Sequence, residues 1–204
     1  MKRIAMLVGL GLLIAPPSWL AAQESSGATH GEVGVYADYL HFTPGGSSTD
    51  FVGAGGRAAF RFHWMALEAE MNYDFARNFT TTQTSGSGAT VTTTFVKTGV
   101  RPLTGLFGPV FYAGSGPLRA FVTGKVGFIN FSTTNNSNVV SGTTFTNSVE
   151  GVGGAGTHLA VHPGGGLEAN FGPFGLRAEV GDEVYLNNGT YNNLRVTLGP
   201  ELRF

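Results

Sequence analysis

The stretch MALEAEMNYDF, residues 65–75, alternates strictly between two kinds of side chain. The odd positions from Met65 to Phe75 are apolar or aromatic, and the even positions carry Glu68, Glu70, Asn72 and Asp74 after an alanine. A period of two indicates a β-strand with one apolar and one polar face, because a helix would distribute these carboxylates around its axis.

The same alternation extends to other segments. It is clear in 51–62, 118–128 and 194–204, and less regular in 32–42, 159–171 and 175–186. Asp182 has the apolar parity of its segment, which indicates a bulge or the polar rim of a sheet. Segment 100–112 is nearly apolar throughout, so its two faces stay unassigned. Together with 65–75, these segments predict eight strands.

The connections between the predicted strands alternate in length. Tight turns are expected at 62–64, 113–117 and 172–174, and polar loops at 43–50, 76–94, 132–157 and 187–192. Short turns at one end and long polar loops at the other are typical of outer-membrane barrels. The predicted fold is all-β, an eight-stranded antiparallel up-and-down transmembrane β-barrel with the N-terminus on the short-turn, periplasmic side.

Composition excludes several other classes. Of the 204 residues, 12% are charged and 32 are glycine, whereas soluble domains have roughly 25% charged residues and about 7% glycine. A hydrophobic share of 42% is too high for a disordered chain. The net charge of −1 provides no basic surface for nucleic acid. The absence of cysteine excludes disulfides, cysteine-ligated zinc and thiol nucleophiles.

The N-terminus has the three parts of a secretory signal peptide. Lys2 and Arg3 precede an apolar run over 4–15, and the following segment, 16–22, ends in small residues. The run is shorter than the roughly 20 residues that span a bilayer. Cleavage is predicted after Ala22, with Gln23 as the alternative, which leaves 23–204 as the barrel domain. A buried N-terminal helix is the other interpretation.

The polar faces of the predicted strands carry eight acidic and seven basic residues. They are Asp38, Glu68, Glu70, Asp74, Glu168, Glu179, Glu183 and Glu201, with Arg57, Arg61, Arg119, Lys125, Arg177, Arg195 and Arg203. Eight strands leave an interior that side chains can fill, and an unpaired buried ion costs several kcal/mol. We therefore expect a lumen plugged by ion pairs and water. A soluble sandwich, which would turn these polar faces to water, is the competing architecture.

Several short motifs resemble the small eight-stranded outer-membrane β-barrel family, which includes the membrane domain of outer-membrane protein A. They are VGAGGR (52–57) leading to LEAE (67–70), LFGP (106–109), GGGL (164–167) and LRAE (176–179). Leu198, Leu202 and the terminal Phe204 resemble the family's C-terminal assembly signal. Val110, where a basic residue is expected, and Pro200 in the last strand depart from the pattern.

The resemblance implies location in the cell outer membrane after export. It also implies outer-membrane lipids, periplasmic chaperones and the barrel-assembly machinery as partners, and a monomeric state. A structural or surface-interaction role follows as the expected function. A narrow porin-like channel is the first alternative, and a lipid-modifying outer-membrane enzyme is the second.

Catalytic, metal and cofactor motifs are weak. The GVGGAG run at 151–156 matches G-x-G-x-x-G but lacks the strand and helix that a phosphate cradle needs. His158 and His162 share a polar face with Glu168, which suggests lumenal polar residues more than a metal or acid–base pair. A lipid-facing hydrolase needs serine, histidine and an acid together, and His41 has no serine on its strand. We expect no enzyme activity, cofactor or metal.

Overall fold

The computed structural model describes residues 30–43, 48–85, 92–114, 116–135 and 156–204. The predicted signal peptide, its cleavage position and the glycine-rich run at 151–155 lie outside these residues. The described chain forms strands β1 (His30–Phe42), β2 (Thr49–Phe62), β3 (Met65–Asp74), β4 (Arg77–Ser85), β5 (Thr92–Ala113), β6 (Leu118–Asn135), β7 (Gly156–Phe171), β8 (Phe174–Asp182), β9 (Val184–Leu186), β10 (Thr190–Tyr191) and β11 (Leu194–Arg203).

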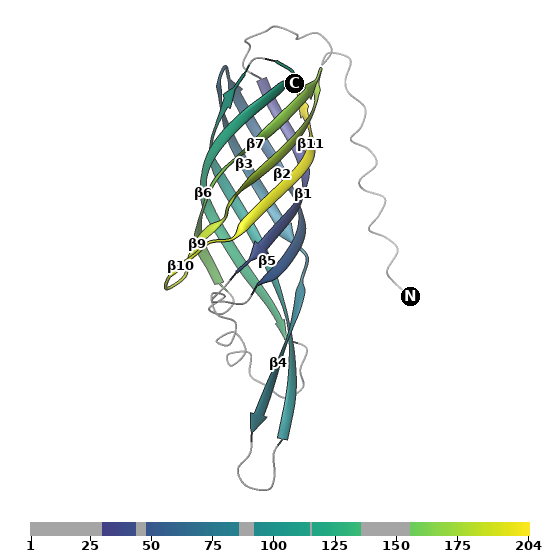
Figure 1. Ribbon diagram of the computed structural model, residues 1–204, viewed down its shortest axis with the longest axis vertical. Coiled ribbons are helices and arrows are strands. Elements are labelled where there is room, and N and C mark those ends of the chain that lie inside the picture. Colours follow the sequence, from purple (N-terminus) through teal and green to yellow (C-terminus); the bar gives the residue numbers. More distant parts are fainter. Residues whose placement is uncertain (1–29, 44–47, 86–91, 115, 136–155) are drawn as a thin grey trace, which may run out of the picture.

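The strands close into one antiparallel barrel, with strongly tilted strands (Figure 1). The elements of the wall pair in the order β1, β2, β3, β5, β6, β7, β8 and β11, and β11 closes the barrel on β1 from Glu32↔Arg203 to His41↔Leu194. β3 and β4 follow each other in one strand of the barrel, as do β8 and β9, so the wall has eight strands. The predicted eight-stranded up-and-down barrel is therefore confirmed.

The predicted loop at 76–94 is wrong in most of its length. β4 and the first part of β5 form a hairpin, paired from Arg77↔Val100 to Ser85↔Thr92, that extends beyond the barrel (Figure 1). The segment was assigned to a loop because it is polar, yet it is rich in threonine, whose branched side chain favours strands. A second small hairpin pairs β9, at the end of the predicted strand 175–186, with β10, which lies within the predicted loop at 187–192.

Burial alternates along the strands as the sequence pattern predicts. In β3 the even-numbered side chains are buried, whereas Leu67, Met71 and Tyr73 are exposed. The faces of β5, which the sequence left unassigned, are now clear, since Val110 is buried and Phe107 is exposed. Polar side chains thus fill the interior, and apolar side chains cover the outside of the barrel.

The outer wall has an uncharged belt between two aromatic rims. On the short-turn side the exposed rings are Phe60, Phe62, Trp64, Phe111, Phe171, Phe174 and Phe204, and Trp64 stacks on Phe111 at 5.7 Å. Tyr39, Tyr73 and Phe75 are exposed on the loop side. Outward positions of the described strands between these rims hold no Asp, Glu, Lys or Arg. In the same residues there is no helix long and apolar enough to cross a membrane.

Gly199 is required where the barrel closes. A Cβ at this position would collide with the Val35 carbonyl oxygen and the backbone of Tyr36 on β1. We expect Gly199→Ala to lower the free energy of unfolding by about 1–3 kcal/mol, the usual cost of overpacking. Urea unfolding can be followed by the fluorescence of Trp64, the single tryptophan of residues 23–204. Gly124→Ala is the control, because a Cβ there meets nothing within 4 Å. Equal losses in both variants would contradict the prediction.

Candidate functional site

The interior of the barrel is the candidate site, because the structure brings the sequence-predicted charged residues together there. Thirteen of them are buried, and Arg119 and Arg203 are the partly exposed members, with 16% and 17% of their side chains accessible. The structure adds Glu32, which is 3% exposed. Glu32 was not among the predicted lumenal residues, although it shares the parity of Tyr36 and Asp38 on the same strand.

One group of ion pairs lies toward the short turns. Arg61 on β2 bonds Glu32 at 2.9 Å and Glu168 at 2.8 Å. Arg203 contacts Glu32 at 3.2 Å, and Arg119 contacts Glu168 at 3.4 Å. These five residues and Glu201, which has a carboxylate oxygen within 4.8 Å of the other two glutamates, form the short-turn cluster.

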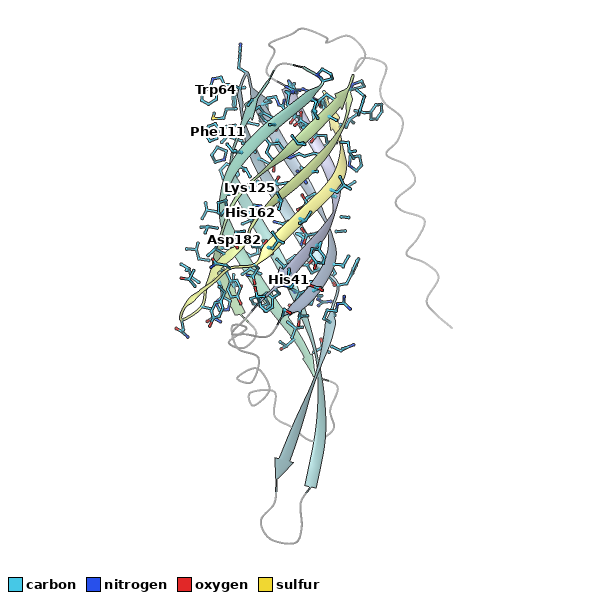
Figure 2. All side chains as sticks on the ribbon, in the orientation of Figure 1. His41, Trp64, Phe111, Lys125, His162 and Asp182 are labelled. Carbon is cyan, nitrogen blue, oxygen red and sulfur yellow. The ribbon has the colours of Figure 1, made fainter. Side chains whose placement is uncertain are left out.

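A second group surrounds Lys125 at mid-height in the barrel, where Figure 2 labels it. The Lys125 Nζ lies 2.7 Å from Glu68, 2.7 Å from Glu70 and 2.8 Å from Glu179. Arg177 bonds Glu68 at 2.6 Å and Glu179 at 2.8 Å. The ammonium thus occupies the centre of a carboxylate triplet that would otherwise suit a metal ion.

Arg57 completes this central cluster. Its guanidinium lies 3.6 Å from Glu179 and 4.5 Å from the centre of the Tyr36 ring. His162 is also buried here, with Nε2 3.2 Å from Glu179. His158 lies further along β7 against the ring of Tyr185, at 6.2 Å, so the two histidines have different neighbours. His162 is thus placed as a hydrogen-bonding residue of the lumen.

The third group lies toward the loops and centres on Arg195. Its Nε is 2.7 Å from Asp38, and its Nη1 is 2.8 Å from Glu70 and 3.3 Å from Glu183. Asp74 is buried beside them and receives a hydrogen bond from the Asn72 amide. We refer to Asp38, Asp74, Glu183 and Arg195 as the loop-side cluster.

An apolar cap lies between the charged clusters and the loops. Phe42 packs at 5.8 Å from Phe51 and 5.6 Å from Phe131, and it stacks on Tyr185 at 5.9 Å. The buried members of the cap are Leu40, Phe42, Phe51, Val100, Leu106, Ile129, Phe131, Ala160 and Tyr185. The cap was not predicted, because charged side chains alone marked the inward faces in the sequence. The parity shared by Leu40 and Asp38 is the signal that could have found it.

Solved structures of known barrels are similar to this arrangement of strands. Ail, the attachment invasion locus protein of Yersinia pestis, aligns with a TM-score of 0.53 and 13% identity over 88% of this chain and 100% of its own. The N-terminal β-barrel domain of Pseudomonas aeruginosa OprF gives 0.51 and 14% over 87% and 100%. Neisserial surface protein A gives 0.50 and 9% over 85% and 95%.

The chain has the fold of the small eight-stranded outer-membrane β-barrels. No family model and no curated protein matches the sequence. The likeness is therefore one of fold alone.

One more cluster lies on the outer wall of this outer-membrane-type barrel, at its loop-side rim. His41 Nδ1 is 2.6 Å from Asp50, whose carboxylate also accepts a hydrogen bond from Tyr39 at 2.9 Å. A histidine oriented by an aspartate resembles part of a catalytic triad. Among the described side chains, the hydroxyl bonded to this pair is that of Tyr39, and it contacts the aspartate instead of the histidine. Within the described part of the chain, the pair therefore lacks a placed nucleophile.

Proposed function

We propose that the protein is an outer-membrane barrel with a closed lumen and a structural or surface-interaction role, without catalytic activity. The observation that carries the proposal is the filling of the lumen. Charged clusters fill the lumen from the short turns toward the loops, and the apolar cap fills it on the loop side of these clusters. An ion crossing the lumen would have to displace several buried ion pairs and then enter an apolar layer, both of which cost several kcal/mol.

The outer wall supports placement in a membrane. An uncharged belt with aromatic rims suits a bilayer with its two interfaces, where aromatic girdles lie in outer-membrane barrels. The proposed partners are therefore outer-membrane lipids around a monomer. Leu198 and Phe204 are exposed on this wall at 53% and 51%, and Leu202 shares their strand face. This accessibility suits the proposed recognition of Leu198, Leu202 and Phe204 by the assembly machinery, after periplasmic chaperones deliver the chain.

Conductance in planar bilayers tests the closed lumen. We expect the reconstituted protein to insert without a steady current, with a heat-dependent gel shift as evidence that it has folded. A steady current in the wild type that changes in Arg57→Ala or Glu68→Ala would contradict the proposal. That result would favour the narrow porin-like channel, because both residues line the lumen.

Lipid analysis tests the absence of catalysis. We expect lipid A from cells that express the protein to have an unchanged mass, because no described side chain places a nucleophile beside His41 and Asp50. A mass change that disappears in His41→Ala would contradict this and favour the lipid-modifying enzyme.

A further inference from the structure

The lysine and arginine residues outside the lumen gather at one place on the barrel. Seven of those in 23–204 belong to the lumenal clusters, and the other three are Arg77, Lys97 and Arg101. All three lie on β4 or on the part of β5 next to it, where the β4–β5 hairpin leaves the barrel on the loop side (Figure 1). The base of this hairpin is therefore the basic part of the outer surface.

Arg101 belongs to the outer face of the wall. It has the strand parity of Phe107 and Phe111, which are 53% and 37% exposed. Its Nη1 donates a hydrogen bond to the Tyr73 hydroxyl at 2.6 Å, and its guanidinium carbon lies 5.2 Å from the centre of the Tyr73 ring. Because Tyr73 belongs to the loop-side aromatic rim, these contacts hold the guanidinium at the depth where a bilayer has its headgroups.

No carboxylate among the described residues forms an ion pair with Arg101. The acidic residues outside the lumen in this part of the chain are Asp50 and Asp182. Both accept hydrogen bonds from other groups, at 2.6 Å and 2.8 Å. The phenol of Tyr73 is an uncharged partner, and a guanidinium has five N–H donors. Arg101 thus presents a positive charge at the rim that no described acid balances.

A hollow of about 220 Å³ lies beside Arg101, lined also by Ala76, Asn78, Gly99 and Thr134. Gly99 is two residues from Arg101 on β5, so the two share the outer face of the strand. It is paired with Asn78 on β4 and with Thr134 on β6, and both of these side chains are exposed. The hollow therefore combines one cation with a neutral amide and a hydroxyl, over a residue that has no side chain.

We propose that this hollow binds the phosphate group of a lipid in the outer leaflet, a phosphorylated glycolipid of the lipid A class. The proposal rests on the proposed placement of the barrel in an outer membrane, and it names the lipid partner and its site. A guanidinium matches the geometry of a phosphate and forms short, charge-assisted hydrogen bonds with it. The amide and the hydroxyl suit the polar sugar that carries the phosphate.

The wall next to the hollow favours a lipid over a free anion. Met71, Phe107 and Val126 lie further toward the short turns on three neighbouring strands, and they are 55%, 53% and 50% exposed. Acyl chains can lie on these side chains while the phosphate occupies the hollow. A free phosphate ion would make the polar contacts alone, so we expect it to bind much more weakly than the lipid.

Lipid binding is measured by native mass spectrometry of the protein, purified in a mild detergent and titrated with lipid A. We expect the wild type to bind bisphosphorylated lipid A at least about tenfold more tightly than dephosphorylated lipid A, the ratio for loss of a charged hydrogen bond. Millimolar inorganic phosphate should not displace the bound lipid.

Two variants test the hollow itself. Arg101→Gln should bind the two forms of lipid A equally, because the charged donor is lost. Gly99→Val should also lose the preference, although it keeps every charge, because it places a side chain in the hollow. A Cβ at Gly99 would meet Asn78 Oδ1 at 3.5 Å and the Thr134 carbonyl oxygen at 3.8 Å, which are ordinary contacts, so we expect the strand to accommodate it.

Arg77→Gln is the matched control. Arg77 carries the same charge at the same rim, but it is paired with Val100, whose side chain is buried, and it does not line the hollow. Its Nε donates to the Asp50 carbonyl oxygen at 2.8 Å. We expect Arg77→Gln to keep the wild-type preference for phosphorylated lipid A.

Wild-type protein that binds the two forms equally, or neither form, overturns the proposal, whatever the folding of the variants. Equal losses in Arg77→Gln and Arg101→Gln, or a full preference in Gly99→Val, overturn the hollow as the site. Displacement by millimolar inorganic phosphate overturns the lipid as its occupant. Insertion into phosphatidylcholine vesicles, followed by the heat-dependent gel shift, is measured separately. Failure to insert contradicts the proposed membrane placement, whereas insertion without the lipid preference contradicts the hollow alone.

Discussion

Lys125→Gln is expected to lower the free energy of unfolding by about 3–5 kcal/mol, the usual cost of removing one partner from a buried ion pair. Lys125 is 2% exposed, and its ammonium nitrogen lies within 2.8 Å of Glu68, Glu70 and Glu179. Without it, these carboxylates repel one another at short range in an interior that water screens poorly. Urea unfolding of the barrel, followed by Trp64 fluorescence, measures the loss.

Arg119→Gln is the control for this effect. Arg119 has a side chain that is 16% exposed, and its ion pair to Glu168, at 3.4 Å, involves a carboxylate that Arg61 also binds. Its guanidinium also lies 5.9 Å from the centre of the Tyr112 ring. We expect a loss of about 1 kcal/mol or less, as for exposed pairs. Comparable losses in the two variants would show that the central cluster contributes no special stability and would weaken the ion-pair plug.

Phe42→Ala is expected to cost about 3–5 kcal/mol, the range for removing a buried phenylalanine ring. Phe42 is 0% exposed and touches Phe51, Phe131 and Tyr185 at ring distances below 6 Å. The wall of the barrel cannot collapse around the missing ring, because backbone hydrogen bonds on both sides hold β1 at its distance from the other strands. The same unfolding measurement checks this value.

Phe60→Ala is the control for Phe42→Ala, because it also removes a phenylalanine ring but not from the interior of the barrel. Phe60 is 49% exposed on the outer wall, where detergent or lipid fills the space that the ring leaves. We expect a clearly smaller loss than for Phe42→Ala. If Phe60→Ala is the more damaging change, the apolar cap does not pack as the structure indicates.

The alternation in 65–75 predicted the inside and outside of β3 correctly, and the same reasoning holds for 51–62, 118–128 and 194–204. The alternation did not predict the inner and outer faces of 100–112, because both faces are apolar. Val110 packs inside the barrel against Ala66 and Phe121. Polarity misled at 77–85, where a threonine-rich segment continues as β4 beyond the barrel.

Which side chains face the lumen could be predicted from the sequence alone, because alternate Cβ atoms of a strand point to opposite sides whatever the strand pairs with. The nearly balanced charge of the lumen could be predicted in the same way. The three-dimensional arrangement alone shows that Lys125 on β6 meets Glu70 on β3 and Glu179 on β8. These contacts cross the lumen, and they depend on the tilt and stagger with which the strands close into a barrel. The residue pattern of a single strand does not specify this tilt and stagger.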